Sequence, residues 1–596
     1  MVRPLPSCLK HAYSYYLSRT ITKVLNLKLL IKISLIVVFV GYSTFGSSQN
    51  LDGLTKRDPF VLSGNISTGT SFYTVAGREN RRNPFAYFLN VAPTVSVYGF
   101  DFPFSFTYRD QKGSFSKPFQ RFDFNPSYKW VKLGFGNTSL DLSPYTMSGQ
   151  YYKGFSVELT PKNWRIKGGA GNLENPLAQI DSVIAGTVIL PTYTRKTIAG
   201  SVGYGGKKKT IDLIFFKAKD NIESTDLTTI DKSLLSPEEN VVIGLKIGFP
   251  LLKILTVKAN MAGSVHSANQ ESIPEFSSED EKQFVSNFKD LFNYNVSSKV
   301  QFAGDASINM KIKRFRMGLK FKRVDPFYKS LGTYYFQEDY QNLTLNTSFG
   351  LLKNKVRFTG SGGLQQNNLN KLRESTRKRK IINATLSLTP SKSFSLTVRA
   401  SNFSSNRTPV LTTLNDSLKF TQTTETYGLM PVFIKKGKTN TNTISGMLNY
   451  QKMVDLGLDL EGNSGVDNYT GNVSFRRSNN KTKTSISTSL LYNRNVIGLL
   501  ESQRIGANIG GSKTIYKKLV SANATLGFTQ NSINSETDGS TITGNIGLRY
   551  KIKKKIAVGL NTNFLIRDSK IQSYQELRGT FKVSYQFTTK KEKAKK

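Results

Sequence analysis

Basic side chains alternate with apolar ones along several stretches of this 596-residue chain. In residues 315–324, Arg316, Lys320 and Lys322 occupy one set of alternate positions, and Met, Leu and Phe residues occupy the other. Successive side chains of a β-strand point to opposite faces, so such a stretch would present one basic face and one apolar face. Ammonium and guanidinium groups gathered on one face attract anions, so the pattern points first to anion binding or anion passage.

The same alternation assigns a larger group of cations to the polar faces of strands. An Arg or Lys that faces lipid at mid-membrane costs about 2–4 kcal/mol, so in a membrane barrel these side chains should face the lumen. The expected lumen-facing cations are Lys132, Arg165, Lys167, Lys311, Arg316, Lys320, Lys322, Arg357, Arg399, Arg549 and Lys551.

Enzymatic chemistry finds little support in the sequence. Beyond the N-terminal apolar segment the chain holds one histidine, His266, and no known motif frames its neighbours Ser264 and Ser267. A hydrolase would need a serine, a base and an orienting acid brought together in space. Zinc-ligand spacing, a phosphate-binding loop and a nucleophile elbow do not occur. We therefore expect no catalytic residues, no cofactor and no metal site, and an outer-membrane enzyme of lipase type is the least favoured alternative.

The elements that must position these side chains are strands, and they are clearest in residues 541–587. Three runs there alternate between apolar and polar residues, with a basic turn at residues 553–554. Alternation with a period of two over about ten residues predicts half-apolar strands, and a meander of them predicts a transmembrane β-barrel. A soluble β-sandwich would alternate in the same way, but aromatic residues at strand ends, long strands and an export signal favour the membrane.

Short Lys-rich turns alternate with long polar connections along most of the chain. This rhythm predicts an all-β fold: one large antiparallel barrel of about 26 strands. Barrels of this class have short periplasmic turns and long extracellular loops, and an even strand number places both termini on the periplasmic side. The predicted turns include residues 313–314, 390–393 and 451–453, and the predicted long loops include residues 325–341 and 402–439.

An export signal precedes the predicted barrel. Residues 25–40 are the one long apolar run: Lys23, Lys28 and Lys32 supply charge, residues 33–40 are the apolar segment, and small residues that suit cleavage follow. The single cysteine, Cys8, lies before that point, so the exported chain would contain no disulfide. We expect location in the cell outer membrane. The expected divisions are a signal peptide over residues 1–48, of which 1–23 can be interpreted as an extension before the natural start, a short segment over 49–60, the barrel over 61–587 and a basic periplasmic tail over 588–596.

The chain has a formal net charge of +43, which restricts its partners. Three roles stay open for the excess Lys and Arg: solvating turns and lipid phosphates, lining an anion-favouring lumen, or docking an acidic protein. Outer-membrane lipid and lipopolysaccharide are expected partners, with an outer-membrane or periplasmic protein as a further one. Nucleic acid is not expected, because the sequence holds no recognition module or basic helical stripe.

Four stretches carry a family resemblance: residues 119–130 (FQRFDFNPSYKW), 142–146 (LSPYT), 157–161 (VELTP) and 323–332 (RVDPFYKSLG). They resemble a group of poorly characterised outer-membrane β-barrel proteins of Bacteroidota. The resemblance implies a fold and a location, and it brings no substrate and no site residues.

An open barrel of about 26 strands, roughly 50 Å across, would leak, so its own loops or another protein must fill it. The sequence predicts a non-enzymatic channel that transports solutes through a basic, anion-favouring lumen. The alternative is a plugged or accessory subunit of a larger outer-membrane secretion or surface-assembly complex.

Overall fold

The computed structural model describes the chain from residue 58 to residue 589 with internal gaps. The described ranges are 58–110, 121–174, 192–206, 209–224, 236–274, 291–333, 337–409, 420–455, 465–516, 519–552 and 555–589. The chain divides into two units, Met1–Pro59 and Phe60–Lys596, and the strands belong to the second unit. The expected signal peptide and nearly all of the short segment after it lie outside the described residues, as does most of the expected basic tail.

The first half of the unit is a succession of strands. They are β1 (Phe60–Ala76), β2 (Phe85–Val97), β3 (Phe100–Arg109), β4 (Arg121–Phe124), β5 (Ser127–Tyr128), β6 (Val131–Thr138), β7 (Met147–Ser148), β8 (Tyr152–Leu159), β9 (Trp164–Glu174), β10 (Thr194–Tyr204), β11 (Thr210–Asn221), β12 (Glu239–Pro250), β13 (Leu255–Ser267), β14 (Ser298–Ile312) and β15 (Phe315–Val324).

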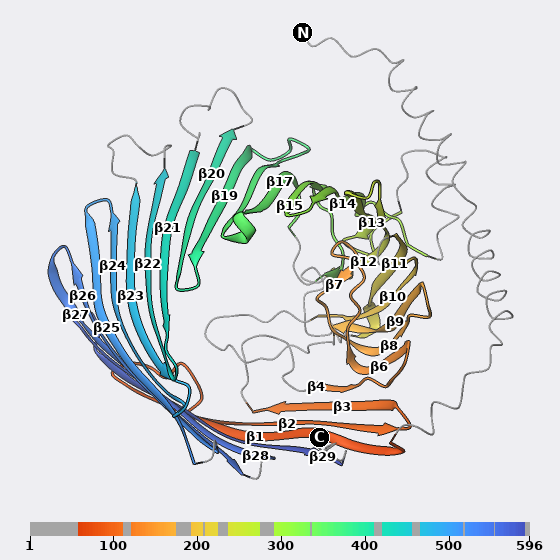
Figure 1. The fold of residues 1–596 in the computed structure, drawn as a ribbon. Helices are drawn as coiled ribbons and strands as arrows, with labels where there is room; N and C mark the ends of the chain where they lie inside the picture. The colour runs from red at the N-terminus through yellow and green to blue at the C-terminus, as the bar shows by residue number, and fades with distance from the viewer. Residues whose placement is uncertain are drawn as a thin grey trace, which may run out of the picture. The chain divides into compact units, whose positions relative to one another are not determined.

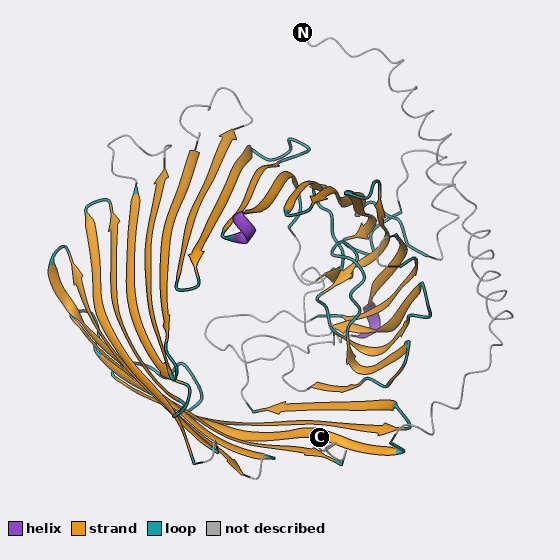
Figure 2. Cartoon of the chain, in the orientation of Figure 1, coloured by secondary structure: helices purple, strands orange, loops and turns teal. Residues whose placement is uncertain are grey.

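The second half continues in the same way with longer strands. They are β16 (Gly332–Thr333), β17 (Tyr340–Leu351), β18 (Val356–Asn367), β19 (Ser375–Ser391), β20 (Phe394–Pro409), β21 (Phe420–Lys436), β22 (Asn440–Asp455), β23 (Val466–Asn479), β24 (Thr484–Ile497), β25 (Leu500–Ile515), β26 (Val520–Ile533), β27 (Glu536–Ile552), β28 (Ile556–Ser569) and β29 (Tyr574–Thr588). The described helices are two short 3-10 segments, η2 (Ile222–Ser224) and η4 (Leu352–Asn354) (Figure 2).

The strands close on themselves. Neighbours along the chain pair antiparallel, and β1 pairs with β2 on one side and with β29 on the other (Figure 1). The main sheet has 27 segments, but β4 and β5 share one place between β3 and β6, so the barrel has 26 strands. The predicted all-β fold and strand number are confirmed. Within the described residues, no helix is long and apolar enough to cross a membrane.

Most of the predicted turns do join consecutive strands in the structure, but the prediction for one region is wrong. Residues 451–453 lie inside β22, and the predicted loop at 402–439 contains the end of β20 and the whole of β21. The turn between β21 and β22 is at residues 437–439. Residues 421–426 are all Thr, Gln or Glu, so the two faces of that part of β21 do not differ in polarity and the alternation is lost.

The outer face of the barrel is apolar and exposed. Leu490, Leu526 and Phe302 are 64%, 50% and 62% exposed, although each lies in mid-strand. Tyr450 and Tyr469 stack on neighbouring strands with ring centroids 4.8 Å apart, as expected of an aromatic girdle. In lipid every backbone polar group must be satisfied internally, which a closed barrel achieves. The protein is a transmembrane β-barrel of the cell outer membrane.

A pair of neighbouring substitutions in β26 tests which face meets lipid. Leu526→Arg should cost about 2–4 kcal/mol in the free energy of unfolding, because it places a cation in hydrocarbon. Thr525→Arg, on the opposite face, should change it by less than about 1 kcal/mol. Guanidinium unfolding of the barrel refolded in lipid measures both, and equal costs at the two positions would contradict the assigned faces.

Cysteine labelling tests the orientation. The connection between β18 and β19 at residues 368–374 should be extracellular, and the turn between β19 and β20 should be periplasmic. In a Cys8→Ser background, Lys371→Cys should react with a membrane-impermeant maleimide on intact cells, whereas Ser391→Cys should react only after lysis. The reverse pattern would invert the topology.

Candidate functional site

Two connections at the same end of the barrel turn back into its interior. One covers residues 139–151, between β6 and β8, and the other covers residues 325–339, between β15 and β17. We call these connections the loop pair; residues 334–336 of the second lie outside the described part. Each contains a two-residue strand, and Figure 1 shows one of these, β7, inside the ring of strands.

The loop pair covers apolar side chains of the inner wall. Tyr145 and Met147 from the first loop and Tyr328 from the second are at most 2% exposed. They belong to one buried cluster with Phe216 of β11 and Val324 of β15, both 0% exposed. Burying a large apolar side chain stabilises by about 1.5–3 kcal/mol, so this cluster gives the loops a fixed position against the wall.

A seam joins the two loops to each other. The strands β7 and β16 pair in parallel, and the Tyr328 hydroxyl donates to the Tyr145 carbonyl oxygen at 2.6 Å. The Ser330 hydroxyl donates to the Thr146 carbonyl oxygen. Gly332 is required at this seam, because a Cβ there would lie 2.4 Å from the Thr146 carbonyl oxygen. Both loops carry a stretch that the sequence analysis singled out by family resemblance.

Asp305 of β14 connects the first loop to the basic wall. It accepts a hydrogen bond from the Tyr145 hydroxyl at 2.7 Å, and its other oxygen lies 3.1 Å from the Lys320 ammonium. The Lys322 ammonium lies over the rings of Tyr145 and Tyr340, 5.6 and 5.1 Å from their centroids. Burial raises the pKa of Tyr145 far above its usual value and the bond to Asp305 raises it further, so the hydroxyl remains a donor.

Glu238 anchors the second loop. Its carboxylate accepts from the Lys329 ammonium and lies 3.0 Å from the Arg195 guanidinium, with His266 at 3.7 Å. Burial opposes ionisation, but His266, Lys329 and the charge of Arg195 outweigh it and lower the pKa of Glu238 to about 2. A depressed pKa stabilises the fold above the ordinary value of 4.5, and this stabilisation is lost as the pH falls through about 2.

The serines beside His266 make structural contacts, Ser264 to the second loop and Ser267 to the connection between β13 and β14. The Ser264 hydroxyl donates to the Lys329 carbonyl oxygen at 2.6 Å, and the Ser267 hydroxyl donates to the Asn295 side chain at 3.0 Å. Among the described residues, neither serine makes a hydrogen bond with His266. In that same part of the chain, no group of three potential metal ligands comes together. The geometry around His266 is that of a structural contact.

Strand register places all the predicted lumen-facing cations on the face opposite the exposed apolar side chains of their own or the paired strand. Four of them have structural partners: Arg165 with Asp212, Lys167 with Glu158, Lys320 with Asp305, and Lys322 with the two tyrosine rings. The other seven have no carboxylate within 4.0 Å among the described residues: Lys132, Lys311, Arg316, Arg357, Arg399, Arg549 and Lys551.

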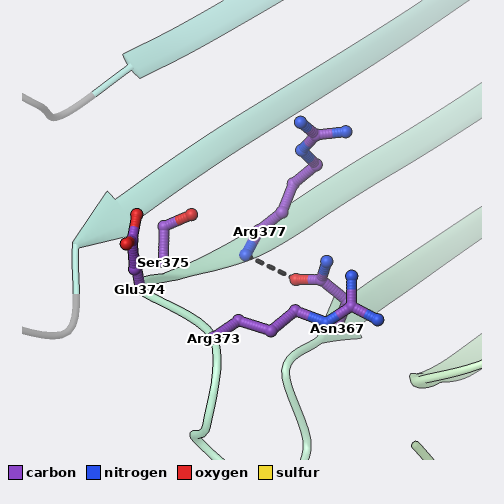
Figure 3. Close-up of a pocket in the computed structure, with 5 residues that line it drawn as sticks. All are labelled: Asn367, Arg373, Glu374, Ser375 and Arg377. Carbon is purple, nitrogen blue, oxygen red and sulfur yellow. Dashed lines mark hydrogen bonds between the residues drawn. The ribbon is translucent and has the colours of Figure 1, made fainter. Parts of the chain in front are cut away.

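A small polar hollow of about 450 Å³ lies where β18 ends and β19 begins. Figure 3 shows Arg377 rising on one side and Arg373 extending along the other, with Asn367 between them. The Arg377 backbone N–H donates to the Asn367 side-chain oxygen at 2.7 Å, and the Arg373 guanidinium lies 2.6 Å from Asp339. Glu374 also lines the hollow, so charges of both signs meet there and its excess of positive charge is small.

The sequence analysis missed the residues that hold the loop pair. In the sequence Asp305 has no acidic neighbour and Glu238 is followed by Glu239, and the partners of Asp305 and Glu238 lie far away along the chain. Lys246 was also missed; its ammonium donates to the Leu142 carbonyl oxygen at 2.9 Å. The one sequence feature that pointed to these loops was the family resemblance at residues 142–146 and 323–332. It lies in both loops, but it does not indicate that the two loops contact each other.

Comparisons with known proteins give only distant likeness. No protein-family model matches the sequence, and no curated protein matches it. Among solved structures, the P pilus usher (PapC) translocation pore has 10% sequence identity and a TM-score of 0.34, covering 88% of this chain and 99% of that one. The FrpB iron transporter from Neisseria meningitidis has 9% identity and a TM-score of 0.35, covering 90% and 84%. OccK8 (OprE) of Pseudomonas aeruginosa has 12% identity and a TM-score of 0.29, covering 66% and 98%.

Gly332→Ala should open the seam between the loops. The added methyl group must displace the Thr146 backbone or the Phe216 ring, which should weaken the contact by about 1–3 kcal/mol. Amide hydrogen exchange of residues 139–151 should therefore rise about 5- to 150-fold. Gly362→Ala is the matched control, since its methyl group meets nothing within 4 Å. Equal exchange in the two variants would show that the seam does not hold the loops.

Proposed function

We propose that this protein is a non-enzymatic outer-membrane channel that passes anionic solutes along a basic inner wall. The observation that carries the proposal is the set of seven cations on the inner face without a carboxylate within 4.0 Å among the described residues. Charges that lack a partner leave a net field in the lumen, whereas paired charges largely cancel.

The arrangement of these cations suits passage more than tight binding. Arg357, Arg399 and Arg549 lie on β18, β20 and β27, so positive charge is spread along the wall. A ring of cations lowers the barrier for anions and raises it for cations, and weak sites in series let a solute leave as easily as it enters. The loop pair packs against part of the inner wall (Figure 1), which supports the expectation that the chain's own loops help to fill so wide a barrel.

In this proposal the outer face of the barrel binds lipid and lipopolysaccharide. Exposed apolar side chains would contact outer-membrane lipid, and cationic side chains near the barrel ends would contact the phosphates of lipopolysaccharide.

Charge reversal on the wall tests the proposal. Combining Arg357→Glu, Arg399→Glu and Arg549→Glu should move the reversal potential in a KCl gradient toward cation preference, because the lumen then carries carboxylates in place of cations. Planar bilayers at low and high salt measure the shift, which should shrink as salt screens each charge.

The control combines Arg357→Lys, Arg399→Lys and Arg549→Lys, which keeps the charge and should keep the selectivity. Unchanged selectivity after charge reversal would show that the basic wall does not set it. Absence of any conductance, with a stoichiometric partner co-purifying in gentle detergent, would favour the accessory subunit of a larger complex.

A further inference from the structure

A groove of about 790 Å³ crosses the inner wall from β13 to β19. Strand register aligns its lining in two neighbouring rows, each running from strand to strand around the wall. The first row contains Thr256, Asn309, Gly318, Asn346, Ser361 and Asn383. The second row contains Lys311, Arg316, Ser348, Thr359 and Thr385. We call this feature the amide groove.

One end of the amide groove is basic. Lys311 and Arg316 lie directly opposite each other on β14 and β15, and Lys258 of β13 lines the same end. Like charges placed directly opposite across two strands destabilise a sheet. None of the three has a carboxylate within 4.0 Å among the described residues. A bound anion would relieve this repulsion.

The rest of the amide groove is neutral and rich in hydrogen-bonding groups. Asn309, Asn346 and Asn383 recur on every second strand, about 9–10 Å apart by strand spacing. All three are exposed, and within the described residues the amides of Asn346 and Asn383 make no hydrogen bond to protein. Each amide offers both donors and an acceptor, which suits the hydroxyl groups of a sugar.

Gly318 keeps the middle of the groove open. It lies between Asn309 and Asn346 in the first row, and a Cβ at this position would lie 2.7 Å from the Asn309 side-chain oxygen. Any larger residue would therefore displace that amide or fill the floor of the groove.

We propose that the amide groove binds an acidic oligosaccharide, with its hydroxyls on the asparagine amides and its carboxylates on Lys258, Lys311 and Arg316. A guanidinium holds a carboxylate by two parallel hydrogen bonds, and amides select a polyhydroxylated ligand over a simple anion. This inference rests on the proposed function in naming the class of solute that the channel would take. The ligand site is separate from the cations that the selectivity test changes.

Binding of trigalacturonate to the purified full chain in detergent, measured by calorimetry, tests the inference. The unmodified protein should bind it saturably and more weakly at high salt. Combining Lys258→Gln, Lys311→Gln and Arg316→Gln should weaken binding at least about tenfold. The matched control removes three inner-face cations outside the seven with Arg567→Gln, Arg578→Gln and Lys582→Gln, and should stay within about twofold.

A second variant tests the groove without changing charge. Gly318→Val should weaken trigalacturonate binding at least about fivefold by filling the floor. Its control, Gly362→Val on the outer face of β18, should leave binding unchanged.

Each remaining outcome decides one part of the inference. Equally tight binding of maltotriose would overturn the role of the cations, and equally tight binding of inorganic phosphate would overturn the role of the amides. No trigalacturonate binding by a protein that conducts anions would overturn the sugar site and leave the channel standing. Binding without any conductance would overturn the channel and leave the site standing.

Discussion

The rest of the structure depends on the hydrogen-bonded pairing of the first and last strands. β1 and β29 join from Ser63–Thr588 to Ala76–Gln575, so the sheet has no free edge. An unpaired edge in hydrocarbon would leave a row of backbone N–H and C=O groups unsatisfied, at several kcal/mol for each group. Closure fixes which face meets lipid, and the pleat then directs every second side chain into the lumen. Cations that would be costly outside are tolerated inside.

The inner wall divides its cations between two roles. Lys320 contacts Asp305, and Lys322 contacts the two tyrosine rings. These two cations therefore help to hold the first loop in place. Arg357, Arg399 and Arg549 have no such partner among the described residues, and in the proposed function it is their charge that acts on the lumen. A wide barrel can therefore hold its own loops against one part of the wall while another part keeps a positive field.

Much of the fold could be predicted because apolar and polar residues alternate with a period of two along a strand that has one apolar and one polar face. The turn at residues 313–314 was placed correctly because apolar alternation is strong on both sides of it. The prediction from alternation failed at residues 421–426, where both faces of the strand are polar. The loop pair could not be predicted, because Tyr145 meets Asp305 across 160 residues and no local pattern encodes that contact. The contact of Lys322 with the Tyr145 ring could not be predicted for the same reason.

The amide groove could not be predicted either, although every residue in it is visible in the sequence. Asn309, Asn346 and Asn383 fall in line only when the register of the strands from β14 to β19 is known, and a slip of one residue would send each to the other face. Register is a property of paired strands and cannot be obtained from the alternation of a single one.

The most direct test of the central claim is the reversal potential of the unmodified full-length protein in a planar bilayer across a KCl gradient. The account predicts chloride preference at low salt that declines as salt is raised, because screening shortens the reach of the unpaired wall cations. Cation preference, or a chloride preference that salt does not weaken, would contradict it.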